Sequence, residues 1–394
     1  MAVPSSDAQV PHEHIDVSDG GDMSLYIDDY DPTIRQNEPS GDRVGESGAK
    51  RLAQTASIKV QRSILAERSH RWCSKETDVG LSGDTVRSME LWLRAFHSTT
   101  DALPVQSISV EEVWHTIMAG DKYGFDFQRL KSWFVAWYKW MRTENGEEKF
   151  FEEFGPQLLF PCYAFNYAVG FQDLTRFITY NESRHIIEIN PTHHRQMHLR
   201  PLIIRKSLAV FAMWFVRRNH LNAAKDRLRT RLHQALFTRV NEIIDEATCA
   251  CKEKTVFDFL KELRRIRVSP LDSSSTKASI AEMLDRLQQF NAVNTRAHTS
   301  VSQSRQRLCL HCRLNGKVIV EEAIERVSKY FDGLCLDCME RTKDLKVDRN
   351  KDQDYWFHHL WKESYDRKCR LSHGEPTWYF SFMGRKEKRG LIAE

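Results

Sequence analysis

The chain has 394 residues, enough for two or three domains, and 41% of them are hydrophobic, enough to build buried cores. The formal net charge of +4 is too close to neutral to indicate nucleic-acid binding by itself. No apolar run approaches the roughly 18 residues that span a bilayer, and the polar N-terminus lacks the apolar core of a signal peptide. We therefore expect a cytoplasmic or nuclear protein, in which clustered cysteines bind metal rather than form disulfides.

The first part of the chain combines short strands with amphipathic helices. Residues 1–16 are polar and are expected to be disordered. Hydrophobic periodicity then predicts, in chain order, strands at 22–27 and 57–60 on either side of a long loop at 30–55, and helices at 63–69, 85–97, after Ser109, and at 130–141. Ser109 with Glu112 matches a capping box. Residues 17–145 are thus expected to form an α+β domain.

The helix predicted at 130–141 carries an aromatic stripe: Trp133, Phe134, Trp137, Tyr138 and Trp140. Large aromatic side chains gain most by burial, so we expect this stripe to pack in a core. An exposed groove for a partner is the alternative.

Residues 146–293 are predicted to be a mainly helical region, punctuated by Pro156, Pro161, Pro191 and Pro201. Apolar residues recur every four positions from Leu228 to Val240, with several arginines around them. Such a pattern favours an amphipathic helix with a solvated basic side; a surface for RNA or phosphate is the alternative. Polar residues 294–307 are expected to be a linker.

Four segments of the first part occur in an order typical of a known family. They are Gly21–Ile27, Ser57–Ser69, Leu81–Asp84 with the apolar helix after it, and Ala119–Tyr123 with its Asp-Lys-Tyr sequence. Together they resemble the BTB/POZ domain. The resemblance implies a protein-interaction domain without catalytic residues, whose relatives often form homodimers and sometimes recruit cullin-type ubiquitin ligases. The whole chain also resembles fungal BTB-type proteins with a helical middle and a cysteine-rich tail.

Residues 308–394 are expected to be a cysteine-rich zinc module. Two C-x-x-C pairs supply four thiols, at Cys309, Cys312, Cys335 and Cys338. Two residues between the cysteines let both thiolates of a turn reach one ion, and two such turns complete a tetrahedral structural zinc site. A helix predicted at 321–331 would return the chain to the metal.

A second cluster follows, formed by His358, Cys369 and His373. It could hold a second zinc ion, or Cys369 and His373 could pack in a small core with the aromatic run at 378–383, which reads as one strand. The pair His194 and His198 is interpreted as surface histidines.

The sequence contains no phosphate-binding glycine loop and no G-x-S-x-G or H-E-x-x-H motif. We therefore expect a non-enzymatic protein-interaction adaptor, with itself or a cullin-type scaffold as partner and no membrane contact. The alternative is a nucleic-acid-binding or transcription-associated protein that uses the zinc tail and its basic residues. A RING-like ubiquitin ligase ranks last, because a cross-braced RING needs more ligands than this tail supplies.

Overall fold

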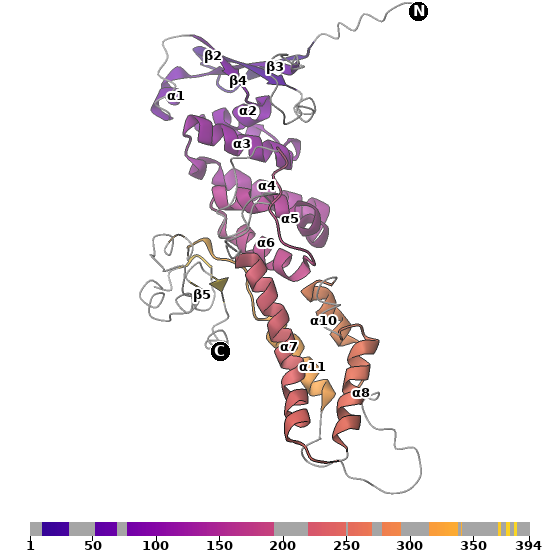
Figure 1. The fold of residues 1–394 in the computed structure, drawn as a ribbon. Helices are drawn as coiled ribbons and strands as arrows, with labels where there is room; N and C mark the ends of the chain where they lie inside the picture. Colours follow the sequence, from indigo (N-terminus) through magenta and orange to yellow (C-terminus); the bar gives the residue numbers. More distant parts are fainter. Residues whose placement is uncertain are drawn as a thin grey trace, which may run out of the picture. The chain divides into compact units, whose positions relative to one another are not determined.

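The structure is a computed structural model. It describes residues 10–30, 52–68, 77–192, 220–249, 251–269, 278–292, 315–337, 340, 369–371, 376–378 and 382–383. The chain divides into two compact units, unit 1 (Met1–Tyr167 with Ile189–Met197) and unit 2 (Ala168–Glu188 with His198–Glu394). The four-stranded sheet belongs to unit 1, whereas the described part of unit 2 is mostly helical (Figure 1). The protein is therefore a mixed α and β structure in which helix predominates.

The sheet of unit 1 contains β1 (His12–Asp16), β2 (Met23–Tyr30), β3 (Leu52–Val60) and β4 (Asp78–Ser82), in the order β1-β3-β2-β4. β2 and β3 pair antiparallel, and the outer strands β1 and β4 each run parallel to their neighbour. The alternating residues Met23, Leu25 and Ile27 are buried, which is the period-two pattern of a strand with one covered face. The strands predicted at 22–27 and 57–60 are confirmed, but both are longer than predicted: β2 extends to Tyr30, and β3 begins at Leu52, inside the loop predicted at 30–55.

The prediction that residues 1–16 are disordered is wrong for His12–Asp16, which form the edge strand β1. Polar side chains attach it to β3: the His12 ring bonds Thr55 at 2.8 Å and the His14 ring bonds Ser57 at 2.5 Å. Only Ile15 of the strand is buried. A strand held by backbone pairing and polar contacts has no hydrophobic signal in the sequence.

The helices of unit 1 are α1 (Arg62–Arg68), α2 (Val86–Phe96), α3 (Val110–Tyr123), α4 (Lys131–Asn145) and α5 (Glu147–Ala164), with short 3-10 turns at Thr100–Ala102, Val105–Ser107 and Phe127–Leu130. The Ser109 hydroxyl accepts the Glu112 amide and the Glu112 carboxylate accepts the Ser109 amide, so the predicted capping box is confirmed. α5 follows α4 directly and packs against it, so the predicted boundary at residue 145 falls inside this unit.

Four of the five aromatic residues in the stripe of α4 are buried in the core of unit 1, whereas Trp140 is partly exposed. Phe134 and Trp137 are fully buried, and Tyr138 is 1% exposed. The Phe134 ring stacks on Phe165 with centroids 4.6 Å apart, and the Tyr138 ring meets Phe150 edge-on at 5.0 Å. Such pairs add to the free energy gained by burial. The prediction of core packing is confirmed for these side chains.

Two prolines predicted to interrupt the chain lie inside α5 instead. Pro156 and Pro161 are both interior to the helix. Pro161 has no N–H, so the carbonyl of Gln157, four residues earlier, loses its helical partner. The indole N–H of Trp114 donates to that carbonyl at 2.8 Å. A tertiary contact therefore satisfies the group that the proline leaves unpaired, and the helix continues.

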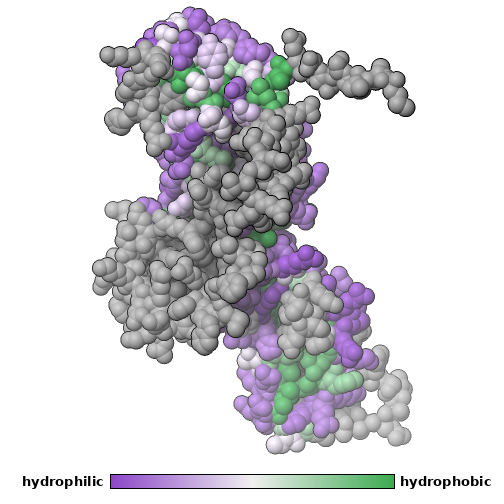
Figure 2. Space-filling view, turned by 45° about the horizontal axis from the view of Figure 1, so that its top comes forward, coloured by the Kyte–Doolittle hydropathy of each residue, from purple (hydrophilic) through white to green (hydrophobic). Residues whose placement is uncertain are grey.

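Unit 2 contains α6 (Ala168–Asn181), α7 (His220–Glu246), α8 (Lys252–Arg265), α10 (Ile280–Gln288) and α11 (Gly316–Ser328). α11 lies beside α7 (Figure 1). Leu228, Leu232, Leu236 and Val240 of α7 are buried, which confirms the predicted apolar face. Figure 2 shows an apolar area bordered by hydrophilic residues in the lower part of the view. No helix among the described residues is long and apolar enough to cross a bilayer.

The predicted strand at 378–383 is wrong as a single element. Pro376–Trp378 (β5) and Phe382–Met383 (β6) pair antiparallel, so the chain reverses direction between them. The apolar run alone could not reveal this reversal, because a continuous run of aromatic residues is compatible with either arrangement. The predicted linker at 294–307 and the histidine pair His194 and His198 lie outside the described residues.

Candidate metal centre

The C-terminal end of α11 is fixed to α6 by one tyrosine. The Tyr180 hydroxyl of α6 donates to the Val327 carbonyl at 2.7 Å and accepts the Phe331 amide at 3.2 Å. Helix ends leave carbonyl groups without helical partners, and here a side chain from the neighbouring helix satisfies one of them. The chain beyond α11 therefore begins from a fixed position.

A buried threonine fixes the next part of the chain. The Leu334 amide donates to the Thr175 hydroxyl oxygen at 2.9 Å, and the same hydroxyl donates to the Phe171 carbonyl of its own helix at 2.8 Å. Thr175 is fully buried. A buried amide without an acceptor is costly, so this hydroxyl holds the residue that precedes Cys335 against α6.

Gly333 lets the two segments approach closely. Its φ of +93° lies in the left-handed region, which side chains other than glycine rarely adopt. A Cβ atom at this position would also overlap the Gln172 carbonyl oxygen of α6. Both the backbone conformation and the packing therefore require glycine two residues before Cys335.

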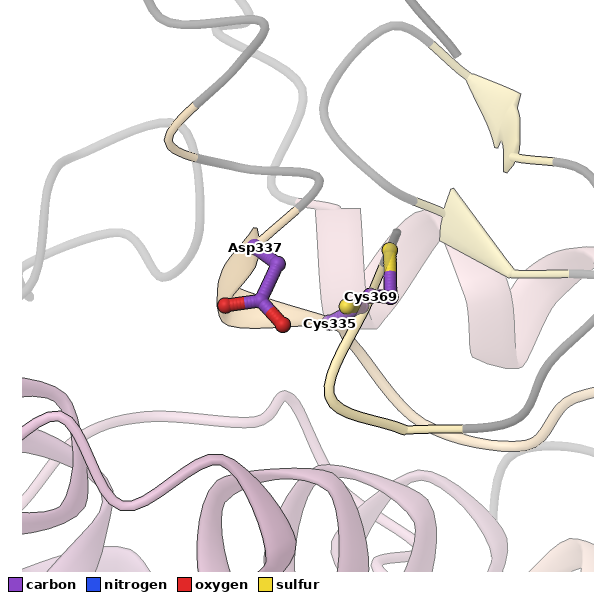
Figure 3. Close-up of side chains that lie close together, drawn as sticks. All are labelled: Cys335, Asp337 and Cys369. Atoms are coloured by element: carbon purple, nitrogen blue, oxygen red, sulfur yellow. The ribbon is translucent and has the colours of Figure 1, made fainter. Parts of the chain in front are cut away.

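Three potential metal ligands meet immediately after this anchored stretch. The ligand atoms of Cys335, Asp337 and Cys369 all lie within 4.8 Å of one another. Cys335 is fully buried, whereas Asp337 and Cys369 are partly exposed. Figure 3 shows that Cys335 and Asp337 come from one short stretch and that Cys369 approaches from a separate segment. This group could hold a metal ion.

The aspartate in this group also binds the segment that carries Cys369. The Arg370 amide donates to one Asp337 oxygen at 2.7 Å, and the Arg370 guanidinium contacts the other through Nε at 2.8 Å and Nη2 at 2.6 Å. An arginine that binds one carboxylate through several N–H groups is itself held in place by these contacts. Asp337 thereby sets the position of Cys369, and the two thiols remain the softer ligands, of the type that selects zinc.

The structure brings together residues that were predicted to belong to different sites. Cys335 was predicted in the first zinc site and Cys369 in the second, yet their sulfur atoms belong to one group. Asp337 was not among the predicted ligands, although it lies inside the second C-x-x-C pair. The remaining predicted ligands lie outside the described residues: Cys309, Cys312, Cys338, His358 and His373. The helix predicted at 321–331 between the two cysteine pairs is confirmed as α11, but it begins earlier and ends earlier, at Gly316 and Ser328.

Comparisons of the chain with protein-family models, with curated proteins and with solved structures found no match.

Proposed function

We propose that the chain is a non-enzymatic protein-interaction adaptor of BTB/POZ type, whose C-terminal part is stabilised by a structural zinc ion. The observation that carries the adaptor proposal is a contact in unit 1. The Asp84 carboxylate accepts the Lys122 ammonium at 2.7 Å and the Tyr123 hydroxyl at 2.6 Å. Asp84 ends the acidic turn of the resemblance, and Lys122 and Tyr123 belong to its Asp-Lys-Tyr sequence.

This contact supports the proposal because it joins two segments that were matched independently. Asp84 is only 6% exposed, so its charge needs partners. Lys122 also donates to the Ser82 carbonyl at 2.7 Å. Two motifs nearly forty residues apart thus form one polar cluster, as two parts of the same domain would. The BTB/POZ resemblance implies binding to a second copy of the chain or to a cullin-type scaffold.

The adaptor proposal is tested with the purified full chain. Sedimentation velocity over a range of concentrations, with and without the N-terminal region of a cullin, should reveal a dimer or a stoichiometric complex. Asp84→Ala should weaken the complex, because it removes the partner of Lys122 and Tyr123, whereas the exposed Asp101→Ala should leave it unchanged. A chain that stays monomeric and binds no cullin would refute the proposal.

The nucleic-acid alternative predicts a different salt response. Binding to a labelled DNA duplex through phosphate contacts should weaken steeply between roughly 50 and 200 mM salt. An adaptor that buries apolar surface should bind its protein partner with little change over the same range. Steep salt dependence with DNA, combined with no protein complex, would favour the alternative.

The zinc proposal assigns Cys335 and Cys369 as thiolate ligands of one ion. A tetrahedral zinc with bonds of about 2.3 Å holds two sulfurs roughly 3.8 Å apart, and the two thiols already lie within 4.8 Å of each other. The ion needs two further ligands, and Cys338 and the pair Cys309 and Cys312 remain the predicted sources. Asp337 is proposed to position Cys369 through Arg370 rather than to complete the set.

The proposed zinc ion would stabilise the folded conformation of the C-terminal residues around Cys335 and Cys369. Binding free energy at structural zinc sites is on the order of 10 kcal/mol and acts as folding free energy. Removal of zinc with a chelator should therefore raise hydrogen exchange around residues 333–337 and 369–371, and leave the sheet of unit 1 protected. Asp337→Asn and Arg370→Ala should lower zinc affinity to a similar extent, since each removes the same ion pair. A much larger loss of zinc affinity in Asp337→Asn than in Arg370→Ala would instead indicate that Asp337 is a zinc ligand.

A further inference from the structure

One arginine of α7 is partly buried and lacks partners for most of its guanidinium group. The Arg231 Nη1 group donates to the Gln234 side chain at 3.3 Å. Its Nε and Nη2 groups are buried and have no hydrogen-bond partner among the described residues. No described carboxylate pairs with Arg231 either, whereas Arg239 of the same helix pairs with Glu242 at 2.6 Å. A buried cation without partners is costly, so this group is suited to a ligand of opposite charge.

Nε and Nη2 are the two groups with which an arginine binds an oxyanion side-on. The same two groups of Arg265 donate to the two oxygens of the Glu262 carboxylate, at 2.9 and 2.6 Å. In Arg370 they contact the Asp337 carboxylate at 2.8 and 2.6 Å. The unpartnered groups of Arg231 are therefore arranged to hold two oxygens of one ligand.

A further unpartnered donor lies beside this guanidinium. The Tyr330 side chain, just beyond α11, is 2% exposed, and its hydroxyl has no partner of normal hydrogen-bond geometry among the described residues. The Arg231 Cζ atom lies 5.9 Å from the centre of the Tyr330 ring. A buried polar group that makes no hydrogen bond loses its hydration without compensation. Two side chains from different elements thus leave three donor groups without partners at one place.

The charges around Tyr330 also favour a negatively charged ligand. Burial raises the pKa of the Tyr330 hydroxyl, and the positive charges of Arg231 and Arg227 partly offset that rise. No carboxylate among the described residues acts on this hydroxyl. Positive charge attracts an anion more strongly in a buried site than in water, because the effective dielectric constant is lower.

We propose that Arg231 and Tyr330 form a binding site for a phosphate group, carried by inorganic phosphate or by a small phosphate monoester. Nε and Nη2 of Arg231 bind two phosphate oxygens, and the Tyr330 hydroxyl donates to a third. A carboxylate has only two oxygens, so it fits these three donors less well. The bound phosphate would connect α7 to the segment that follows α11.

The test uses the full chain and isothermal titration calorimetry at constant ionic strength, so that screening of surface charge does not change between titrations. Inorganic phosphate should bind saturably, with one phosphate per chain, and acetate at least about tenfold more weakly. A parallel titration with phenyl phosphate distinguishes the two sources. Binding of both supports a monoester ligand, and binding of inorganic phosphate alone supports the free ion. Failure of both to bind, or equally tight binding of acetate, would overturn the proposal.

Variants show whether the two side chains supply the site. Tyr330→Phe keeps the ring and removes one donor, so phosphate affinity should fall at least about tenfold. Arg231→Gln removes both the charge and the side-on pair and should cost more than Arg231→Lys, which keeps the charge. Arg264→Gln removes an equal charge from an exposed position on α8 and should leave phosphate affinity unchanged.

The far-UV circular dichroism of each variant shows that its helices are retained. Tyr330→Phe is the most conservative change, so it keeps the test decisive if Arg231→Gln folds poorly. Wild-type phosphate affinity in Tyr330→Phe, Arg231→Gln or Arg231→Lys would overturn the proposal. An equal loss of phosphate affinity in Arg264→Gln and Arg231→Gln would also overturn it, because the effect would then reflect net charge alone.

Discussion

The Thr175 hydroxyl offers the sharpest test of how α6 positions the candidate metal centre. Thr175→Val replaces it with a methyl group of similar size. The Leu334 amide then loses its acceptor in a buried site. Leaving a buried donor unsatisfied costs about 1–3 kcal/mol. The Phe171 carbonyl lies inside α6, where a helical amide four residues on can satisfy it, so the cost should fall mainly on the segment that leads to Cys335.

Thr179→Val is the matched control for this substitution. Thr179 lies one turn along the same helix and is also fully buried, but its hydroxyl donates only to the Thr175 carbonyl of α6. Both variants exchange the same side chains in a helix, so differences in helix propensity cancel. Only Thr175→Val removes a contact with the segment around Leu334.

Hydrogen exchange measures this cost directly. If opening of the segment becomes easier by about 1–3 kcal/mol, protection of the Leu334 amide should fall roughly 5- to 150-fold in Thr175→Val, because about 1.4 kcal/mol corresponds to a factor of ten. Zinc affinity, measured by competition with a chelator, should fall by no more than the same factor. Equal protection of residues 331–337 in the two variants would refute the view that α6 positions Cys335.

Three further predictions concern other parts of the structure. Trp114→Phe should lower the free energy of unfolding by at least about 1 kcal/mol in a denaturant titration. The same substitution should cost less in a Pro161→Ala background, because that change restores a backbone N–H for the Gln157 carbonyl. Equal losses in both backgrounds would contradict this explanation. Gly333→Ala should abolish zinc binding in a metal analysis, because alanine would strain the backbone at this positive φ and its Cβ would overlap α6. Full zinc content in this variant would contradict the prediction. Burial raises the pKa of Tyr330 above its ordinary value of 10.0. The stability that the neutral phenol contributes is therefore present below pH 10 and is lost as the pH rises through the folded-state pKa. Tyr330→Phe should make the free energy of unfolding fall less steeply at alkaline pH, and an unchanged slope would contradict the raised pKa.

The Tyr330 prediction depends on the surroundings of its ring. The side chain is 2% exposed, and its hydroxyl has no partner of normal hydrogen-bond geometry among the described residues. The Arg231 guanidinium lies over the ring, with its Cζ 5.9 Å from the ring centroid. That positive charge opposes the effect of burial on the Tyr330 pKa, but burial is the larger cause.

Elements with local signals could be predicted from the sequence. α2 and α3 show apolar residues at helical spacing, and the cap of each is visible as Thr85 or Ser109 just before the helix. The aromatic residues of α4 were expected in a core because their size makes exposure costly. In each case the residues near one another in sequence carry the information.

Features that depend on distant contacts could not be predicted in the same way. β1 is held by Thr55 and Ser57, which lie 43 residues further along the chain than their partners. α5 continues past Pro161 because Trp114 donates to the Gln157 carbonyl. The spacing of cysteines suggested metal binding, but it could not reveal that Cys369 joins Cys335. That contact depends on the ion pair between Asp337 and Arg370, 33 residues apart in the chain.

The zinc content of the full chain tests most directly the claim that Cys335 and Cys369 share one ion. Zinc per chain should be measured for the wild type, Cys335→Ser, Cys369→Ser and the double variant. Each single variant should lose one equivalent relative to the wild type, and the double variant should lose no more than either one. Full zinc retention in Cys369→Ser, or a loss of two equivalents in the double variant, would contradict a shared site.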